Sequence, residues 1–188
     1  MSGMPSGRRL PYPGLRSFQR DETDLFFGRE ASVNQMIRRL AASRFLAVLG
    51  ASGSGKSSLV RTGLLDGLDL GLLAQAGSWW RVIDIRPGGE PLRNLARGLC
   101  PENADDDVEQ MRAFLLRGPR SVAEWAGGDL AAGENLLLLV DQFEELFSQC
   151  RQEEERAAFV AALCSALDTG QPLTLVIVLR ADFYARLA

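Results

Sequence analysis

Apolar residues in this chain form short continuous runs, and stretches with helical spacing lie between these runs. Residues 45–49, 136–140 and 173–179 are almost wholly apolar, as in strands that are buried on both faces of a parallel sheet. Residues 80–85 alternate in polarity and end shortly before Pro87, which predicts a further strand. Because strands and helices alternate, we expect an α/β fold with a parallel sheet and flanking helices.

Five longer segments have apolar residues at helical spacing. They lie before residue 40, after residue 58, over 91–99, after residue 107 and over 152–167. The last segment places Phe159, Val160, Leu163 and Leu167 on one face. The acidic run 105–107 favours the start of a helix over a metal site.

Shorter signals mark the remaining segments. Ser121 and Glu124 have the spacing of a capping box at the start of a short helix with Trp125, and Gly127-Gly128 predicts a loop after it. Residues 1–14 contain Gly, Ser and Pro, and we expect a flexible lead-in there. Residues 15–188 are expected to form one domain.

A glycine-rich loop joins the first predicted strand to the next helix. Residues 50–57 match G-x-x-x-x-G-K-[ST], the pattern of a phosphate-binding P-loop. Lys56 is the only lysine among 21 lysine and arginine residues, and its compact ammonium suits a triphosphate better than a planar guanidinium. The chain is therefore predicted to bind a nucleoside triphosphate through Gly50, Ser52, Gly53, Ser54, Gly55, Lys56, Ser57 and Ser58.

The composition limits which partners and which catalytic residues we expect. The net charge of −3 gives no support for a nucleic-acid or anionic-membrane partner, and no apolar run is long enough to span a bilayer. The chain has no histidine, so acid–base work must fall to carboxylates. The three cysteines, Cys100, Cys150 and Cys164, lack ligand spacing and are expected to be reduced thiols of a cytoplasmic protein.

The second half of the predicted site begins where the strand 136–140 ends. Asp141 follows this strand, and with the Ser57 hydroxyl it would hold Mg2+. Glu144 and Glu145 lie close behind, and either carboxylate is placed to orient and deprotonate an attacking water. For each glutamate the alternative is a solvated first turn of a helix.

Arg180 ends the last predicted strand. A guanidinium at this position suits the sensing of a γ-phosphate. The alternative is an exposed arginine that pairs with Asp182.

Together with residues 11–18, 26–30 and 179–184, these motifs resemble the STAND NTPases, the signal-transduction ATPases with numerous domains. The likeness runs from about residue 11 to residue 188 and is closest to the bacterial novel STAND group, which often precedes WD-repeat β-propellers. The resemblance implies an AAA-like P-loop core that uses ATP or ADP with Mg2+. It also implies a nucleotide-controlled switch that forms homo-oligomers when active, in some cases as an immune or antiviral effector.

By position, the resemblance implies that Phe27, Gly28 and Arg29 hold the adenine end of the nucleotide. Lys56 and Ser57 would be the Walker A pair, Asp141 with Glu144 or Glu145 the extended Walker B motif, and Arg180 the sensor. The sheet order in this class is 5-1-4-3-2. Because residue 188 lies just after the sensor strand, we expect the fifth strand, the helical lid and the winged helix to be missing from this sequence.

Two other functions remain open. The first is an interaction module that binds a nucleotide without turning it over. The second is a small-molecule kinase with the same P-loop, although neither an arginine-bearing lid nor an acceptor pocket is identifiable in the sequence.

Overall fold

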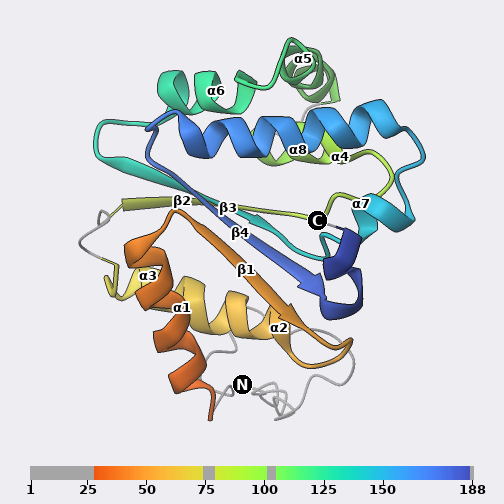
Figure 1. The fold of residues 1–188 in the computed structure, drawn as a ribbon. Helices are drawn as coiled ribbons and strands as arrows, with labels where there is room; N and C mark the ends of the chain where they lie inside the picture. Colours follow the sequence, from red (N-terminus) through yellow and green to blue (C-terminus); the bar gives the residue numbers. More distant parts are fainter. Residues whose placement is uncertain (1–27, 74–78, 101–104, 187–188) are drawn as a thin grey trace, which may run out of the picture.

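A parallel sheet forms the centre of the fold in the computed structural model, which describes residues 28–73, 79–100 and 105–186 (Figure 1). The described strands are β1 (Phe45–Gly50), β2 (Trp79–Ile85), β3 (Glu134–Val140) and β4 (Leu173–Arg180), in the order β1-β4-β3-β2. The register pairs Gly50 with Arg180 and Ile85 with Val140, so the carboxyl ends of the strands share one edge. The predicted α/β class is confirmed.

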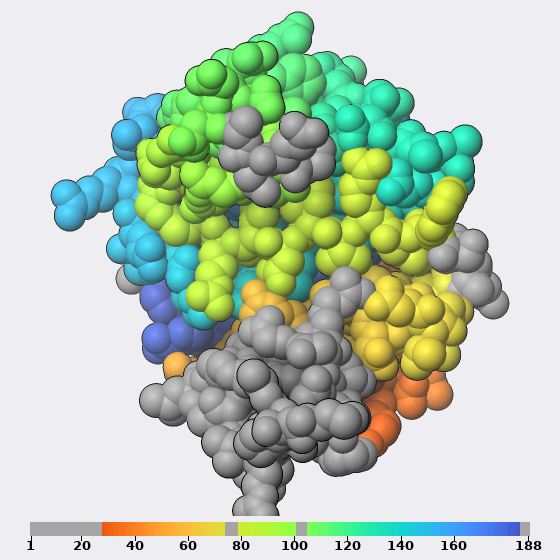
Figure 2. Space-filling model, turned by 180° about the vertical axis from the view of Figure 1, so that it is seen from behind, coloured from red at the N-terminus to blue at the C-terminus, as the bar shows by residue number. Residues whose placement is uncertain are grey.

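Helices cover both faces of this sheet (Figure 1). One face carries α4 (Pro91–Leu99), α5 (Asp105–Leu115), α6 (Ser121–Asp129) and α8 (Glu153–Asp168). The other face carries α1 (Glu30–Ala42), α2 (Lys56–Ser58), the π-helix η2 (Leu59–Leu64) and α3 (Leu65–Asp69). Two short helices, α7 (Glu145–Ser148) and the 3-10 helix η4 (Ala181–Arg186), follow β3 and β4 at the carboxyl edge. From behind, β2 and α4 span the middle of the surface, with α5 and α6 above them (Figure 2).

Alternate residues of β3 enter two separate hydrophobic cores. Leu136, Leu138 and Val140 pack into the core beneath α4, α5, α6 and α8. Leu137 and Leu139 pack into the smaller core beneath α1, η2 and α3. All five side chains are at most 1% exposed. A continuous apolar run suits β3 because both faces of the sheet are covered.

Helix α6 corrects two local predictions. It runs through Gly127 and Gly128 to Asp129, so the glycines lie within a helix and not in a loop. Buried neighbours such as Trp125 pack this helix against the core, and tertiary packing outweighs the low helix propensity of glycine. The predicted capping box is wrong, because Ser121 is the first helical residue and its buried hydroxyl donates to Leu115 O at 3.1 Å.

The apolar face predicted for α8 is partly confirmed by the exposure of its side chains. Phe159 and Leu163 are buried, whereas Val160 is exposed and lies off the buried face. Cys100 and Cys150 are buried, Cys164 is exposed, and all three are free thiols. In the described segments, no helix combines the length and apolar character needed to cross a membrane. The predicted lead-in at 1–14 lies outside the described residues.

Truncation of a central strand residue should destabilise the fold strongly. Leu138→Ala is expected to lower the free energy of unfolding by about 2–5 kcal/mol, because the Leu138 side chain extends from β3 into the larger core and is fully buried there. Leu116→Ala is the control, with an expected change within about 0.5 kcal/mol, because that side chain is exposed. Urea titrations followed by circular dichroism measure both changes, and equal effects would contradict the assigned core.

Candidate functional site

The predicted P-loop directly follows β1 and turns into α2. Gly53 and Gly55 adopt φ values of 72° and 82°, which glycine reaches without steric cost. At Gly50 the backbone passes so close to the loop that an added Cβ would lie 2.9 Å from Ser54 Oγ. The loop therefore folds back on itself in a way that any larger side chain at Gly50 would disturb.

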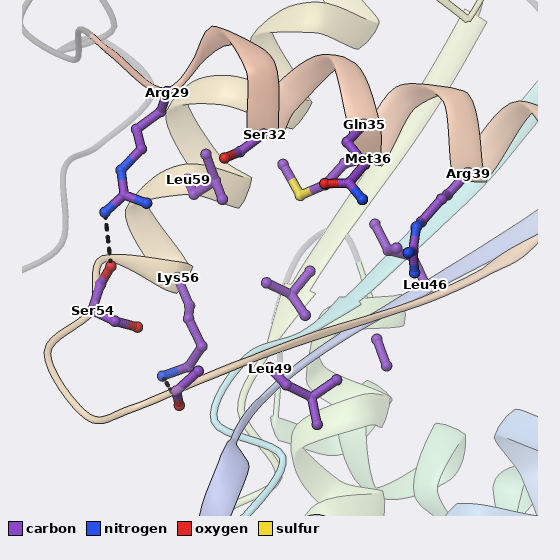
Figure 3. Close-up of a pocket in the computed structure, with 13 residues that line it drawn as sticks. Arg29, Ser32, Gln35, Met36, Arg39, Leu46, Leu49, Ser54, Lys56 and Leu59 are labelled. Atoms are coloured by element: carbon purple, nitrogen blue, oxygen red, sulfur yellow. Dashed lines mark hydrogen bonds between the residues drawn. The ribbon is translucent and has the colours of Figure 1, made fainter.

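Lys56 is the first residue of α2, and its side chain turns back toward the loop (Figure 3). Its Nζ donates to Gly50 O at 2.9 Å and to Ala51 O at 2.7 Å. Both acceptors are neutral carbonyl oxygens. An anionic oxygen would compete well for this ammonium, because it adds the attraction between opposite charges to the hydrogen bond.

Asp141 joins the end of β3 to the start of α2. Its side chain is 1% exposed, and Ser57 Oγ donates to its Oδ1 at 2.7 Å. The backbone N–H of Gln142 donates to the same oxygen at 3.0 Å, and Gln142 itself has a positive φ of 55°. The two predicted magnesium ligands, which are far apart in the sequence, are therefore in direct contact.

The surroundings of Asp141 fit a magnesium ion. Among the residues that the structure describes, no group donates a hydrogen bond of regular geometry to its buried Oδ2, although the Arg61 guanidinium lies 3.0 Å from this oxygen. A hydroxyl and a carboxylate are hard oxygen ligands of the kind that Mg2+ takes, with its remaining positions filled by water and phosphate oxygens. In 28–73, 79–100 and 105–186 there is no cluster of three or more His, Cys, Asp or Glu residues, so an all-protein metal cage is not found there.

Glu144 and Arg180 meet where β3 and β4 end. The backbone N–H of Arg180 donates to Glu144 Oε2 at 3.2 Å. Glu145 is the first residue of α7. The Arg180 guanidinium binds Asp182 with both Nε and Nη2, at 3.1 and 2.6 Å. This ion pair is the alternative that the sequence left open, and a sensor role for Arg180 remains a prediction.

The predicted adenine contacts are only partly within the described residues. Phe27 lies outside them. Gly28 has a φ of 80°, and its N–H donates to Glu30 Oε1 at 3.0 Å. Arg29 extends from the start of α1 to the P-loop, where its Nη2 donates to Ser54 O at 3.4 Å (Figure 3). Of the two that the structure describes, Gly28 and Arg29, it is Arg29 that contacts the loop.

A hollow of about 470 Å3 lies between α1 and β1 beside the P-loop. Lys56, Ser54 and Arg29 line one part of it, and apolar side chains such as Met36 and Leu59 line another (Figure 3). Its size and mixed lining are typical of small-molecule sites. We refer to it as the α1–β1 hollow.

Sequence reasoning missed two charged residues at the site. Arg61 on η2 binds both oxygens of Asp84 on β2, at 2.7 and 3.0 Å, and its Nη2 lies 3.0 Å from Asp141 Oδ2. Hydrogen bonding to Asp84 and the charges of both carboxylates raise the pKa of Arg61. The one available signal was the position of Arg61 one helical turn after Ser57, which alone does not identify its partners.

The family comparison agrees with this geometry. The family model described as novel STAND NTPase 1 matches residues 11–188, nearly the whole sequence. The chain belongs to this STAND NTPase family. A search among curated proteins found no match. In this STAND NTPase domain the all-parallel sheet places Gly50, Asp141 and Arg180 at or just beyond the carboxyl ends of their strands.

The Arg180–Asp182 pair of this STAND domain can be tested by titration. The hydrogen bonds from Arg180, helped by the charges of Arg180 and Lys56, hold the pKa of Asp182 below its ordinary value of 3.8. Any stability from the pair is therefore present above that value and is lost as the pH falls through the lower folded-state pKa. Carboxyl resonances followed by NMR should show the pKa of Asp182 rising toward 3.8 in Arg180→Ala. Arg117→Ala, an exposed change in the turn after α5, should leave this pKa unchanged, and a pKa of Asp182 that does not respond to Arg180→Ala would refute the pair.

Proposed function

We propose that this STAND domain binds ATP with Mg2+ and hydrolyses it as the core of a cytoplasmic signalling switch. The observation that carries the proposal is the convergence of Lys56, Ser57 and Asp141 at one edge of the sheet. The 2.7 Å contact between Ser57 Oγ and Asp141 Oδ1 joins the P-loop to the end of β3. The P-loop precedes this strand in the sequence, which is the order expected of the two motifs. Three free cysteines agree with a reducing compartment.

Binding would use the loop and the α1–β1 hollow together. The loop N–H groups and the N-terminus of the helix that starts at Lys56 offer donors to phosphate oxygens. On binding, the Lys56 ammonium would exchange Gly50 O and Ala51 O for β- and γ-phosphate oxygens. The hollow, bordered by Arg29, is large enough for a base, and we assign the adenine end to this side of the loop.

Hydrolysis would proceed by in-line attack of water on the γ-phosphorus. A bond forms from the water oxygen to phosphorus, the bond to the β,γ-bridging oxygen breaks, and ADP leaves. Glu144 would orient the water and take its proton, because it is the glutamate whose carboxylate already contacts the end of β4. Ser57 and Asp141 would hold Mg2+, which supplies charge neutralisation at the β- and γ-phosphate oxygens when bound.

Arg180 would report on the γ-phosphate. Its side chain is 42% exposed and the side chain of its partner Asp182 is 56% exposed, so the ion pair is weak enough to be exchanged. A bound γ-phosphate offers the same bidentate geometry with more negative charge. ATP and ADP would then differ in whether Arg180 stays with Asp182.

The family suggests how such a difference is used. We propose a resting state with ADP, exchange to ATP on sensing a signal, and homo-oligomer formation in the ATP state. The sensor would lie in further domains of a longer protein, with WD repeats as the family precedent, and the output would be regulatory or antiviral.

Loss of the Lys56 ammonium should abolish nucleotide binding. Isothermal titration calorimetry with ATP or ADP in Mg2+ is expected to show binding to the parent and at least about a hundredfold loss in Lys56→Ala, because charge-assisted bonds to phosphate are removed. Arg44→Ala, a change far from the P-loop at the other end of β1, is the matched control with unchanged affinity. Equal affinities of the parent and Lys56→Ala would contradict the assigned phosphate site.

Turnover tests the role of Glu144 separately. Glu144→Gln is expected to keep nucleotide affinity and to slow phosphate release by roughly a hundredfold or more, because a general base contributes about that much. Glu145→Gln is the matched neighbour, for which little change is expected. Reversal of the two results would move the role to Glu145.

The same assay separates the two alternative functions. Nucleotide binding without turnover in the parent would favour the interaction module, and transfer of the γ-phosphate to an added alcohol would favour a kinase.

A further inference from the structure

Three charged side chains from three elements meet beneath the P-loop helix. Arg61 comes from η2, Asp84 from β2, and Asp141 from the end of β3. The Arg61 guanidinium binds Asp84 through Nε at 2.7 Å and through Nη2 at 3.0 Å. The same Nη2 lies 3.0 Å from Asp141 Oδ2. Asp141 therefore has the Ser57 hydroxyl on one oxygen and a guanidinium beside the other.

Burial makes this contact more than a surface ion pair. The side chains of Arg61 and Asp141 are 13% and 1% exposed. Exposed pairs contribute little because water and salt screen them, whereas charges in a protein interior act on each other through a lower dielectric. Asp141 Oδ2 accepts no hydrogen bond of regular geometry from the described residues. Its nearest described counter-charge is the Arg61 guanidinium, at 3.0 Å. Arg86 is the next, with Nη2 at 3.8 Å.

Arg61 is held in this place by geometry as well as by charge. It lies one turn after Ser57, on the helical face that points to the end of β3. The bidentate grip of Asp84 fixes the guanidinium plane, and it raises the pKa of Arg61 further, so the cation persists at every working pH. Asp84 therefore anchors a permanent positive charge next to the predicted magnesium ligand.

We propose that Arg61 is the counter-cation of Asp141 and that Asp84 anchors it, so that this pair sets the affinity of the site for divalent cations. Arg61 lowers that affinity, because it offsets the negative charge that a divalent cation would meet at Asp141. Asp84 raises it, because it draws part of the Arg61 charge to itself. The site is therefore weak for a metal alone and requires the phosphate oxygens of a nucleotide to complete it. This inference rests on the proposed role of Asp141 at the magnesium site.

The two partners have opposite expected effects on metal binding. With Mn2+ as the probe and nucleotide-free protein, free Mn2+ is measured by electron paramagnetic resonance. Arg61→Gln should bind Mn2+ at least about tenfold more tightly than the parent, and Asp84→Asn about tenfold more weakly, because the changes remove charges of opposite sign near Asp141. A purely structural role for the pair would move both affinities in the same direction, since either change breaks the same contact.

Matched variants separate the local contact from general charge effects. Arg97→Gln and Glu90→Gln carry the same charge changes at exposed positions, and we expect less than about a twofold change in Mn2+ affinity for either. Circular dichroism on each variant reports whether it remains folded. Arg61→Met provides a second neutral replacement with an apolar stem if Arg61→Gln is misfolded.

The outcomes distinguish this inference from the proposed function. Asp141→Asn should weaken Mn2+ binding in both the parent and the Arg61→Gln background. If it does not, Asp141 is not at the metal site, and the metal assignment fails together with this inference. If Asp141→Asn weakens binding but the Arg61 variants leave the affinity unchanged or lower it, only the counter-cation is overturned. Tighter Mn2+ binding in Arg61→Gln that Asp141→Asn abolishes supports both.

Discussion

The buried carboxylate of Asp141 is the constraint on which the site depends. A carboxylate that is 1% exposed needs partners, and it takes them from three directions: the Ser57 hydroxyl, the Gln142 N–H and the Arg61 guanidinium. These contacts fix the start of the P-loop helix and the helix that follows it against the end of β3. Through Arg61 they also include β2. One acidic side chain thus sets the relative positions of the elements that surround the predicted phosphate and metal positions.

The parallel sheet makes that convergence possible. Parallel strands end at the same edge, so β1, β3 and β4 deliver Gly50, Asp141 and Arg180 to one region although they are far apart in the sequence. Two hydrophobic cores hold the strands in register from both faces. At the carboxyl edge, Lys56 binds neutral carbonyl oxygens and Arg180 pairs with the exposed Asp182, and under the proposed function both cations would leave these partners for phosphate oxygens. Under that proposal, the Asp141 carboxylate keeps its contacts while the two cations change partners, which would let the site distinguish bound phosphates.

Local patterns were sufficient to predict the strands and most helices, and long-range contacts were not predictable from them. Residues 136–140 are an unbroken apolar run with a single interpretation in an α/β fold, and they lie in β3. Gly127 and Gly128 predict a loop from the sequence because glycine disfavours helices, but the packing of Trp125 and its neighbours outweighs that preference. Ser121 likewise donates to Leu115 O and not to the helix start. Arg61 was missed because its partners come from two distant strands, and no spacing in the sequence reveals that pairing.

The location of a bound nucleotide tests the account most directly. At 20.5 kDa the protein suits two-dimensional NMR of its backbone amides, recorded with and without ADP or ATP in Mg2+. The account predicts that the largest shifts occur at Gly53, Gly55, Lys56 and Ser57, with further shifts at Asp141 and Glu144 and none in α5. Shifts centred on another surface, or no shifts at millimolar nucleotide, would contradict a nucleotide site at the carboxyl edge of the sheet.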